Sequence, residues 1–170
     1  MMCGITGTPG TGKSLIGTEL AHRGYTVIHL TDTVGPYVTG IDEERDTRLI
    51  DVERWAEEFV PVDGFVEGHF AHLLPCDLII VLRCRPDVLK VRLALRKYRE
   101  EKIRENAEAE ALDSCLIETV ERHDPSQILE LDTTDRDAAY CADRIEHFFR
   151  GEIPADFGHL DWSAFLEAGL

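Results

Sequence analysis

The chain has 170 residues, of which 44% are hydrophobic and 30% charged, a composition that indicates a globular domain and excludes an intrinsically disordered chain. Acidic residues outnumber basic ones by 33 to 18, and the net charge is −15. Because such a surface repels nucleic-acid backbones and anionic membranes, we expect no direct nucleic-acid contact and no membrane association. A charged partner should be a basic protein, unless the charge serves solubility alone.

Apolar runs and helical patterns alternate along the chain. We predict strands in five short apolar segments, at residues 1–6, 25–30, 64–67, 78–82 and 128–131. We predict helices between them, at residues 13–23, 51–59, 86–98, 101–123 and 136–149. The run LIIVL at 78–82 is apolar on both faces, as a central strand of a parallel sheet is. The alternation predicts an α/β fold with three αβα layers and a five-stranded parallel sheet.

Two segments interrupt this alternation. Residues 31–50 have weak periodicity, and residues 96–106, RKYREEKIREN, are charged and carry no apolar stripe. A charged run is usually only a solvated helix face. Because the two segments follow the second and fourth strands, they are also candidates for segments that close over a substrate. The predicted organisation is one domain over residues 1–150 and a C-terminal tail over residues 151–170.

Cysteine usage and apolar run length bear on where the protein works. The five cysteines cannot all pair, and no CxxC motif occurs, which favours reduced and mostly buried thiols. The longest apolar run, at residues 78–82, is too short to span a bilayer. We therefore expect a cytoplasmic protein.

The segment GTPGTGKS at residues 7–14 lies between the first predicted strand and the first predicted helix. It matches GxxxxGK[ST] in full and in the structural context that this motif requires. Its glycines let backbone N–H groups surround an anion at a helix N-terminus. Lys13 then reaches the β- and γ-phosphates, and the Ser14 hydroxyl binds Mg²⁺. The sequence thus predicts binding of a nucleoside triphosphate with Mg²⁺.

Glu67 ends the third predicted strand, and His69 follows after one glycine. Taken alone, both are more often solvated loop residues. Beside a P-loop, Glu67 becomes the candidate carboxylate of the metal site, and His69 a candidate for orienting a nucleophile or a phosphate. His69 and His72 form a weak case for a metal pair, because no Cys or Asp completes it.

Arginine is the prevailing basic residue, with 14 arginines against four lysines. Arg83 and Arg85 lie at the end of the predicted central strand, at the sheet edge where α/β proteins bind ligands. Arg92 and Arg96 lie one helical turn apart before the charged segment. A guanidinium can bind a phosphoryl group through two hydrogen bonds and spread its charge. For Arg99 and Arg104 we prefer the alternative, a surface salt bridge.

Together these features resemble the short-lid adenylate kinases, a family that includes the eukaryotic coilin-interacting nuclear ATPase and archaeal relatives. The resemblance covers about residues 1–149. It rests on GTPGTGKS, on Glu67-Gly68-His69, on the IVLR of residues 80–83, and on the charged segment 96–102 followed by Glu105-Asn106. It implies a P-loop nucleoside monophosphate kinase that transfers the γ-phosphate of ATP to AMP with Mg²⁺. It also implies ATPase activity and a small-subunit ribosomal protein as partner during ribosome maturation.

Carried over residue by residue, the resemblance assigns three sets of positions, with an AMP-binding insert at about 31–50 and a lid at about 96–106. The ATP-binding set is Gly10, Thr11, Gly12, Lys13, Ser14, Leu15, Arg96 and Arg136. The catalytic set is Lys13, Glu67, His69 and Arg96, and Ser14 and Glu67 are expected at the metal. AMP binding is expected at Asp42, Arg45, Arg54 and Arg83, with Arg48 as a further alternative for the AMP phosphate.

The chain departs from the family pattern at several points. Leu15 replaces a second hydroxyl residue, Glu67 stands where eukaryotic members have aspartate, and Lys97 replaces a glycine of the lid. The AMP-binding insert is shorter than in eukaryotic members, and no arginine lies between Arg23 and Arg45. The AMP phosphate ligand is therefore left open.

Three hypotheses for the function follow. The first is an adenylate kinase, in which transfer is in line and the protein positions two nucleotides and neutralises charge. The second is an assembly factor whose ATP cycle gates binding to a ribosomal protein. The third is a P-loop kinase for another small molecule, which the Glu67-Gly68-His69 motif and the lid make the weakest of the three.

Overall fold

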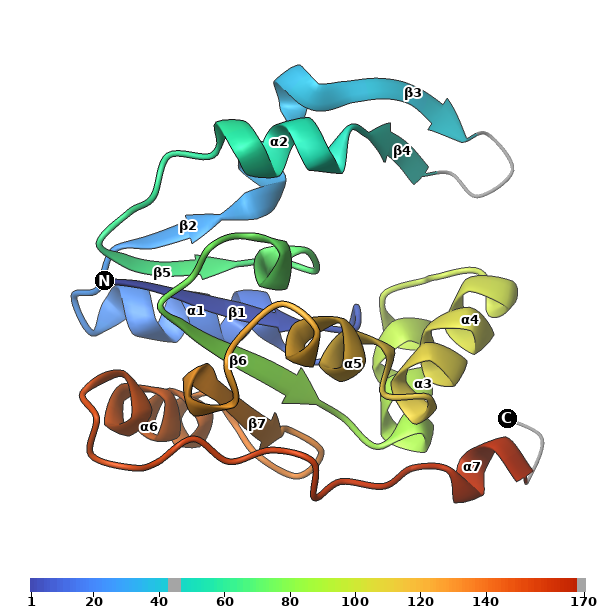
Figure 1. Cartoon of the computed structure of the whole chain (residues 1–170). Coiled ribbons are helices and arrows are strands. Elements are labelled where there is room, and N and C mark those ends of the chain that lie inside the picture. The colour runs from blue at the N-terminus through green and yellow to red at the C-terminus, as the bar shows by residue number, and fades with distance from the viewer. Residues whose placement is uncertain (43–46, 168–170) are drawn as a thin grey trace.

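The computed structural model describes residues 1–42 and 47–167 of the chain (Figure 1). Its main sheet consists of β1 (Met2–Gly7), β2 (Val27–His29), β5 (Gly64–Glu67), β6 (Leu78–Arg83) and β7 (Ile128–Asp132). The strand order is β2-β5-β1-β6-β7, and every neighbouring pair is parallel. The predicted α/β fold with a five-stranded parallel sheet is confirmed.

The register of this sheet brings the sequence motifs to one edge. Ile5 lies opposite Glu67 at the end of β5, and Gly7 lies opposite Leu82 near the end of β6. Because all strands run the same way, their carboxyl ends meet at the edge where the P-loop leaves β1. The P-loop, Glu67 and Arg83 are therefore neighbours in space.

Helices cover both faces of the sheet. On one face, α1 (Lys13–His22) and α6 (Ala138–Phe149) pack against side chains such as Ile5 and Ile80. On the other face, α2 (Val52–Glu58) and α5 (Ser114–Val120) pack against side chains such as Val66 and Val81. Successive strand residues point to opposite faces, so a strand that is covered on both sides is apolar throughout. This explains the uninterrupted LIIVL run of β6.

The helix predicted over 101–123 is wrong in one respect, because it is two helices. α4 (Glu100–Ala111) ends before Asp113, which has a φ of 56°, and α5 starts at Ser114. A left-handed residue cannot continue a right-handed helix. The Asp113 carboxylate forms an ion pair with Arg83 of β6, which anchors the break to the sheet.

The segment before α2 contains a small hairpin that periodicity did not predict. It follows two single-turn 3₁₀ helices, η1 (Leu30–Asp32) and η2 (Gly35–Tyr37), and pairs β3 (Val38–Asp42) antiparallel with β4 (Thr47–Ile50). The hairpin lies beside α2, away from the main sheet (Figure 1). Its strands give a weak sequence signal because much of their surface stays exposed.

The tail closes the far edge of the sheet. The Glu130 N–H donates to the Asp156 carbonyl at 2.8 Å, and the Asp156 N–H donates to the Ile128 carbonyl at 3.1 Å, so the tail runs beside β7. Ile153 and Ala155 pack against the core, and the short α7 (Ala164–Glu167) contacts α4. The structure also contains α3 (Pro86–Leu95), η3 (Ala71–Leu73) and η4 (Pro125–Gln127). No helix in the described ranges has the length and apolar character needed to cross a membrane.

Candidate active site

The P-loop between β1 and α1 has a backbone that requires glycine. Gly7 has a φ of 142° and Gly10 a φ of 93°, and a Cβ on Gly7 would lie 2.5 Å from the carbonyl oxygen of Leu82. Only glycine combines these angles with so close a backbone approach. The loop ends at Gly12, the N-cap of α1, which provides no side-chain cap. The first N–H groups of α1 are thus available to an anion.

Lys13 spans the mouth of this loop. Its Nζ donates to the carbonyl of Gly7 at 2.7 Å and to the carbonyl of Thr8 at 3.0 Å. Burial lowers the pKa of Lys13 to about 8, while nearby carboxylates, Glu67 among them, act in the opposite direction. The two carbonyls also favour the ammonium form. Lys13 forms no salt bridge with any described carboxylate, so its positive charge is available to a phosphate.

Glu67 and Ser14 meet at the edge of the P-loop. Ser14 Oγ donates to Glu67 Oε1 at 3.3 Å, and His29 Nδ1 lies 2.5 Å from the same oxygen. Glu67 is buried, whereas His29 comes from the neighbouring edge strand β2, directly opposite Glu67. The His29 contact was not predicted. The contact follows from the pairing of β2 with β5, which the sequence alone does not reveal.

The Ser14–Glu67 pair fits Mg²⁺ by its chemistry. A hydroxyl and a carboxylate supply the hard oxygen ligands that Mg²⁺ prefers. Across residues 1–42 and 47–167, no group of three or more His, Cys, Asp or Glu side chains could hold a metal ion. A small protein share is usual for Mg²⁺, which takes most of its ligands from phosphates and water.

His69 lies over the start of the P-loop with a defined tautomer. Its Nδ1 is 3.1 Å from the Gly7 carbonyl oxygen, which can only accept, so Nδ1 carries the hydrogen. Loss of solvent lowers the pKa of His69, the Gly7 carbonyl acts against this, and the Lys13 charge lowers it further. The ring is therefore neutral at pH 7, and Nε2 is an acceptor. An acceptor nitrogen can hold a water molecule by one of its hydrogens.

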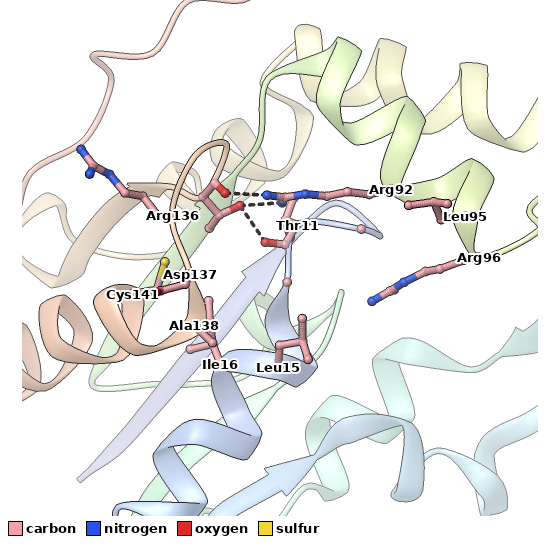
Figure 2. Close-up of a pocket in the computed structure, with 13 residues that line it drawn as sticks. Thr11, Leu15, Ile16, Arg92, Leu95, Arg96, Arg136, Asp137, Ala138 and Cys141 are labelled. Carbon is pink, nitrogen blue, oxygen red and sulfur yellow. Dashed lines mark hydrogen bonds between the residues drawn. The ribbon is translucent and has the colours of Figure 1, made fainter.

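A cavity of about 340 Å³ opens beside the P-loop (Figure 2). It is lined by six of the residues predicted to bind ATP, namely Gly10, Thr11, Gly12, Leu15, Arg96 and Arg136. Lys13 and Ser14 follow Gly12 in the chain at the neighbouring end of the loop. The lining also includes Arg92, one of the arginines considered for phosphoryl binding. The remaining lining residues were not predicted as ligands, namely Ile16, Leu95, Thr133, Asp137, Ala138 and Cys141.

The cavity walls are largely apolar, although Arg92, Arg96, Arg136 and Asp137 also line it. Leu15 of α1 and Leu95 of α3 are 65% and 80% exposed, although both are large aliphatic residues. Together with Ile16 and Ala138 they form a surface suited to a flat aromatic base. The Arg136 guanidinium lies over the Tyr140 ring, 4.6 Å from the ring centroid. Its side chain points away from the other labelled lining residues (Figure 2).

Arg92 and Arg96 have different surroundings, although both line the cavity. Arg92 donates to Thr133 Oγ1 at 3.1 Å and to the Thr133 carbonyl at 2.6 Å, and Thr133 Oγ1 donates to the Thr11 carbonyl at 2.8 Å. Arg92 therefore ties α3 to the P-loop. Arg96 extends into the space between α3 and α1 (Figure 2). It forms no salt bridge within the described part of the chain, and its charge lowers the pKa of Lys13.

Arg83 lies inside the protein, not in the cavity. It is 1% exposed and forms ion pairs with Glu110, Asp113 and Glu130. Glu110 is buried as well and also accepts a hydrogen bond from Thr8 Oγ1 of the P-loop. The network links β6, α4 and the P-loop, so the structure does not bring Arg83 together with the other predicted AMP-binding residues.

Those other residues lie around the hairpin and α2. Asp42 ends β3, and Arg45 falls outside the described residues. Arg54 of α2 is exposed, pairs with Glu58 at 2.8 Å and lies over the Tyr37 ring. Its guanidinium is thus held on the helix surface.

Comparison with known proteins gives the family. A family model described as "AAA domain" matches residues 3–113. A protein named "Putative adenylate kinase" from Archaeoglobus fulgidus is 42% identical over 171 residues, covering 98% of this chain and 94% of that protein. A protein of the same name from Methanothermobacter thermautotrophicus is 40% identical, covering 98% of this chain and 99% of that protein. Another, from Methanocaldococcus jannaschii, is also 40% identical, covering 96% of this chain and 93% of that protein. The chain belongs to this adenylate kinase family.

Solved structures share the fold of this adenylate kinase family member at low identity. An uncharacterised protein from Eubacterium ventriosum has a TM-score of 0.55 at 13% identity, covering 88% of this chain and 98% of its own. A gluconokinase from Sinorhizobium meliloti has a TM-score of 0.51 at 17% identity, with 89% and 96% covered. At these identities the likeness concerns the fold alone.

Two of the departures from the family pattern have a structural account. Leu15 lines the apolar cavity, where an aliphatic side chain adds to the wall. Lys97 has a φ of 60°, the left-handed conformation that glycine adopts without strain. Residue 97 of this adenylate kinase family member thus keeps a glycine-like backbone with a lysine, at a conformational cost of about 1 kcal/mol.

Proposed function

We propose that this protein is an adenylate kinase that transfers the γ-phosphate of ATP to AMP. One observation carries the proposal: an apolar cavity adjoins a P-loop at which Lys13 and Arg96 have no salt-bridge partner in the described structure. An aromatic base fits the apolar walls, and the triphosphate fits the loop. Membership of a family whose named relatives are adenylate kinases supports ATP and AMP as the two nucleotides.

The protein acts in this reaction mainly by position and charge. Transfer is in line and needs no covalent intermediate, so the chain has to hold two nucleotides and spread the charge of the moving phosphoryl group. The N–H groups of α1 and Lys13 hold the triphosphate, and Arg96 reaches over it as the lid closes. Ser14 and Glu67 would hold Mg²⁺, which neutralises phosphate charge when bound.

Arg48 is the ligand we propose for the AMP phosphate. Side chains two apart in a strand share a face, so Arg48 shares the face of β4 with Ile50, which packs against the core. Arg48 has no ion-pair partner among the described residues, whereas Arg54 pairs with Glu58. A guanidinium without a carboxylate partner is free to bind a phosphate.

The two arginines can be separated by steady-state kinetics. Arg48→Ala should raise the KM for AMP about tenfold or more, because a charge-assisted contact to phosphate is lost. Arg54→Ala should change it little. The KM for ATP should stay near the parental value in both variants, which serves as the control. A larger AMP effect in Arg54→Ala would reassign the contact to that residue.

The proposed function itself is tested by nucleotide turnover. Purified protein with ATP and Mg²⁺ should form ADP fastest when AMP is added, and more slowly with CMP, GMP or UMP. Product analysis should show two molecules of ADP for each ATP consumed with AMP. Turnover that no monophosphate stimulates would contradict the kinase proposal and favour an ATP-cycling assembly factor.

ATP hydrolysis is the second activity we propose, and the His69 geometry favours it. A neutral imidazole whose Nδ1 is bound to Gly7 presents Nε2 to water. Hydrolysis would then proceed when no AMP fills the acceptor site. A role in small-subunit maturation, with a basic ribosomal protein as partner, is part of this proposal and is supported by the net charge of −15.

Buried free thiols at the described cysteines favour a reducing, cytoplasmic setting for the protein.

A further inference from the structure

His72 is a buried histidine that the mechanism above does not use. It lies in η3, three residues after His69, and is 1% exposed. Its Nδ1 is 2.8 Å from Thr6 Oγ1, and its Nε2 is 2.9 Å from a carboxylate oxygen of Glu118 on α5. Thr6 Oγ1 is also 3.0 Å from the main-chain carbonyl oxygen of His69. A continuous line of contacts thus runs from surface Glu118 to the backbone of His69.

The number of hydrogens that His72 and Thr6 carry decides which of these contacts can form at the same time. A carbonyl and a carboxylate can only accept, and a threonine hydroxyl has a single hydrogen. If that hydrogen goes to the His69 carbonyl, His72 must donate from Nδ1 to Thr6 and from Nε2 to Glu118. All three contacts can therefore form together only when His72 carries both ring hydrogens.

A neutral His72 leaves one contact unmade. Of the two neutral forms, the one that keeps the hydrogen on Nε2 is favoured, because its hydrogen bond to the Glu118 carboxylate is charge-assisted and stronger than one to the Thr6 hydroxyl. In that form Nδ1 is an acceptor, and the Thr6 hydroxyl turns its hydrogen to Nδ1. The His69 carbonyl then loses its donor from Thr6. Cys115 Sγ lies 3.3 Å from Thr6 Oγ1 and 3.8 Å from His72 Nδ1. Its S–H is a weaker donor than the Thr6 hydroxyl, which lies 2.8 Å from Nδ1, so the hydroxyl remains the main donor to Nδ1.

We infer that His72 is a positioning residue of the active site: its protonation decides whether the Thr6 hydroxyl holds the main chain at His69. The inference deepens the proposed function and rests on it for the role of His69. When His72 is protonated, the loop that carries His69 is fixed to β1. When it is neutral, the loop is released from Thr6 while the fold of η3 and α5 is kept.

Several groups face His72 and set the pH at which this happens. Burial lowers the pKa of His72, and the hydrogen bond and charge of Glu118 raise it. Arg122 and His123, in the turn that follows α5, lower it. His69, on the same loop, is affected in turn, since a charged His72 lowers the pKa of His69 and keeps its ring neutral. As pH falls below the ordinary histidine range, a larger fraction of molecules should therefore have the Thr6 hydroxyl bonded to the His69 carbonyl. The Nε2 atom of His69 should remain an acceptor.

The test follows two nuclei in the full-length protein by NMR between pH 5 and 8. The ring nitrogens of His72 and the carbonyl ¹³C of His69 should titrate with the same midpoint. Thr6→Val keeps the shape of the side chain and removes the hydroxyl, so the His72 ring should still titrate while the His69 carbonyl should not. If the carbonyl titration persists in Thr6→Val, the inference is overturned.

A charge variant provides the second arm. Glu118→Gln keeps an acceptor for Nε2 and removes the charge, and should lower both midpoints by about half a pH unit. Glu121→Gln, at the exposed end of the same helix, is the matched control and should leave them unchanged. The ratio of the ATP hydrolysis rate to the AMP phosphorylation rate should change with pH. The pH at which it changes should move to lower values in Glu118→Gln, together with the NMR midpoints, and should stay at the parental value in Glu121→Gln.

These outcomes separate the inference from the proposed function. Unchanged midpoints in Glu118→Gln, or a His69 carbonyl that does not follow His72, overturn the positioning role even in an active adenylate kinase. Absence of AMP phosphorylation overturns the proposed function and leaves the NMR result standing.

Discussion

Replacement of Lys13 by alanine should abolish AMP phosphorylation and ATP hydrolysis together. Lys13 supplies a positive charge at the mouth of the P-loop, held by the carbonyls of Gly7 and Thr8 and not neutralised by a salt bridge with a described carboxylate. Both reactions need that charge on the triphosphate. Its loss should lower kcat/KM by on the order of a hundredfold or more, the range found for the removal of one preorganised electrostatic contact. Steady-state rates of both reactions at saturating Mg²⁺ measure the effect.

The control for this prediction is a lysine in a different setting. Lys90 of α3 lines a groove on the outer side of α3 and α4, so Lys90→Ala removes the same charge without touching the P-loop. Its rates should stay near those of the parent. Because the side-chain hydrogen bonds of Lys13 within the described part of the chain go to two loop carbonyls, thermal unfolding of Lys13→Ala should remain cooperative. Near-parental turnover in a folded Lys13→Ala protein would contradict the P-loop assignment.

Glu67→Ala and His69→Ala should affect the two activities in different proportions. Glu67 lies with Ser14 where Mg²⁺ would be held, and the metal neutralises the triphosphate whichever nucleophile attacks. Glu67→Ala should therefore depress kinase and ATPase rates by similar factors. In the proposed mechanism His69 offers Nε2 to a water molecule, whereas AMP would be held by contacts to its own phosphate. His69→Ala should lower hydrolysis about tenfold or more beyond its effect on AMP phosphorylation.

His22 is the control for a lost imidazole, because it lies exposed at the end of α1. His22→Ala should leave both rates unchanged. Glu67→Gln keeps an acceptor for Ser14 and His29 but loses the charge, and should resemble Glu67→Ala in rate if the charge is what Mg²⁺ needs. Equal losses of both activities in His69→Ala would assign His69 to a phosphate contact, not to water.

The P-loop and the central strand could be identified from the sequence because each is defined by consecutive residues. Residues 7–14 carry their own conformational requirement in the glycines and their own chemistry in Lys13 and Ser14. The buried strand at β6 is equally plain, because a strand covered on both faces needs an unbroken apolar run. The alternation of strands with helices predicts the layered α/β fold for the same reason.

Other features depend on contacts between distant segments. The helix over 101–123 is broken at Asp113, whose carboxylate pairs with Arg83, 30 residues earlier. Arg83 looked like a ligand residue because it ends a strand at the ligand-binding edge. Its burial among three carboxylates comes from the packing of α4 and β7 beside β6. No periodicity in the sequence encodes those partners.

The sequence by itself determined the P-loop, the alternating fold and the presence of Glu67 and His69 after one strand, since each depends on neighbours in the chain. Only the tertiary structure decided which groups those residues meet. His29 reaches Glu67 because β2 pairs with β5, and His72 reaches Thr6 because η3 packs against β1. The apolar cavity exists because α1, α3 and the start of α6 converge on the P-loop. Contacts of this kind follow from strand order and helix packing, which the hydrophobic pattern of one segment does not specify.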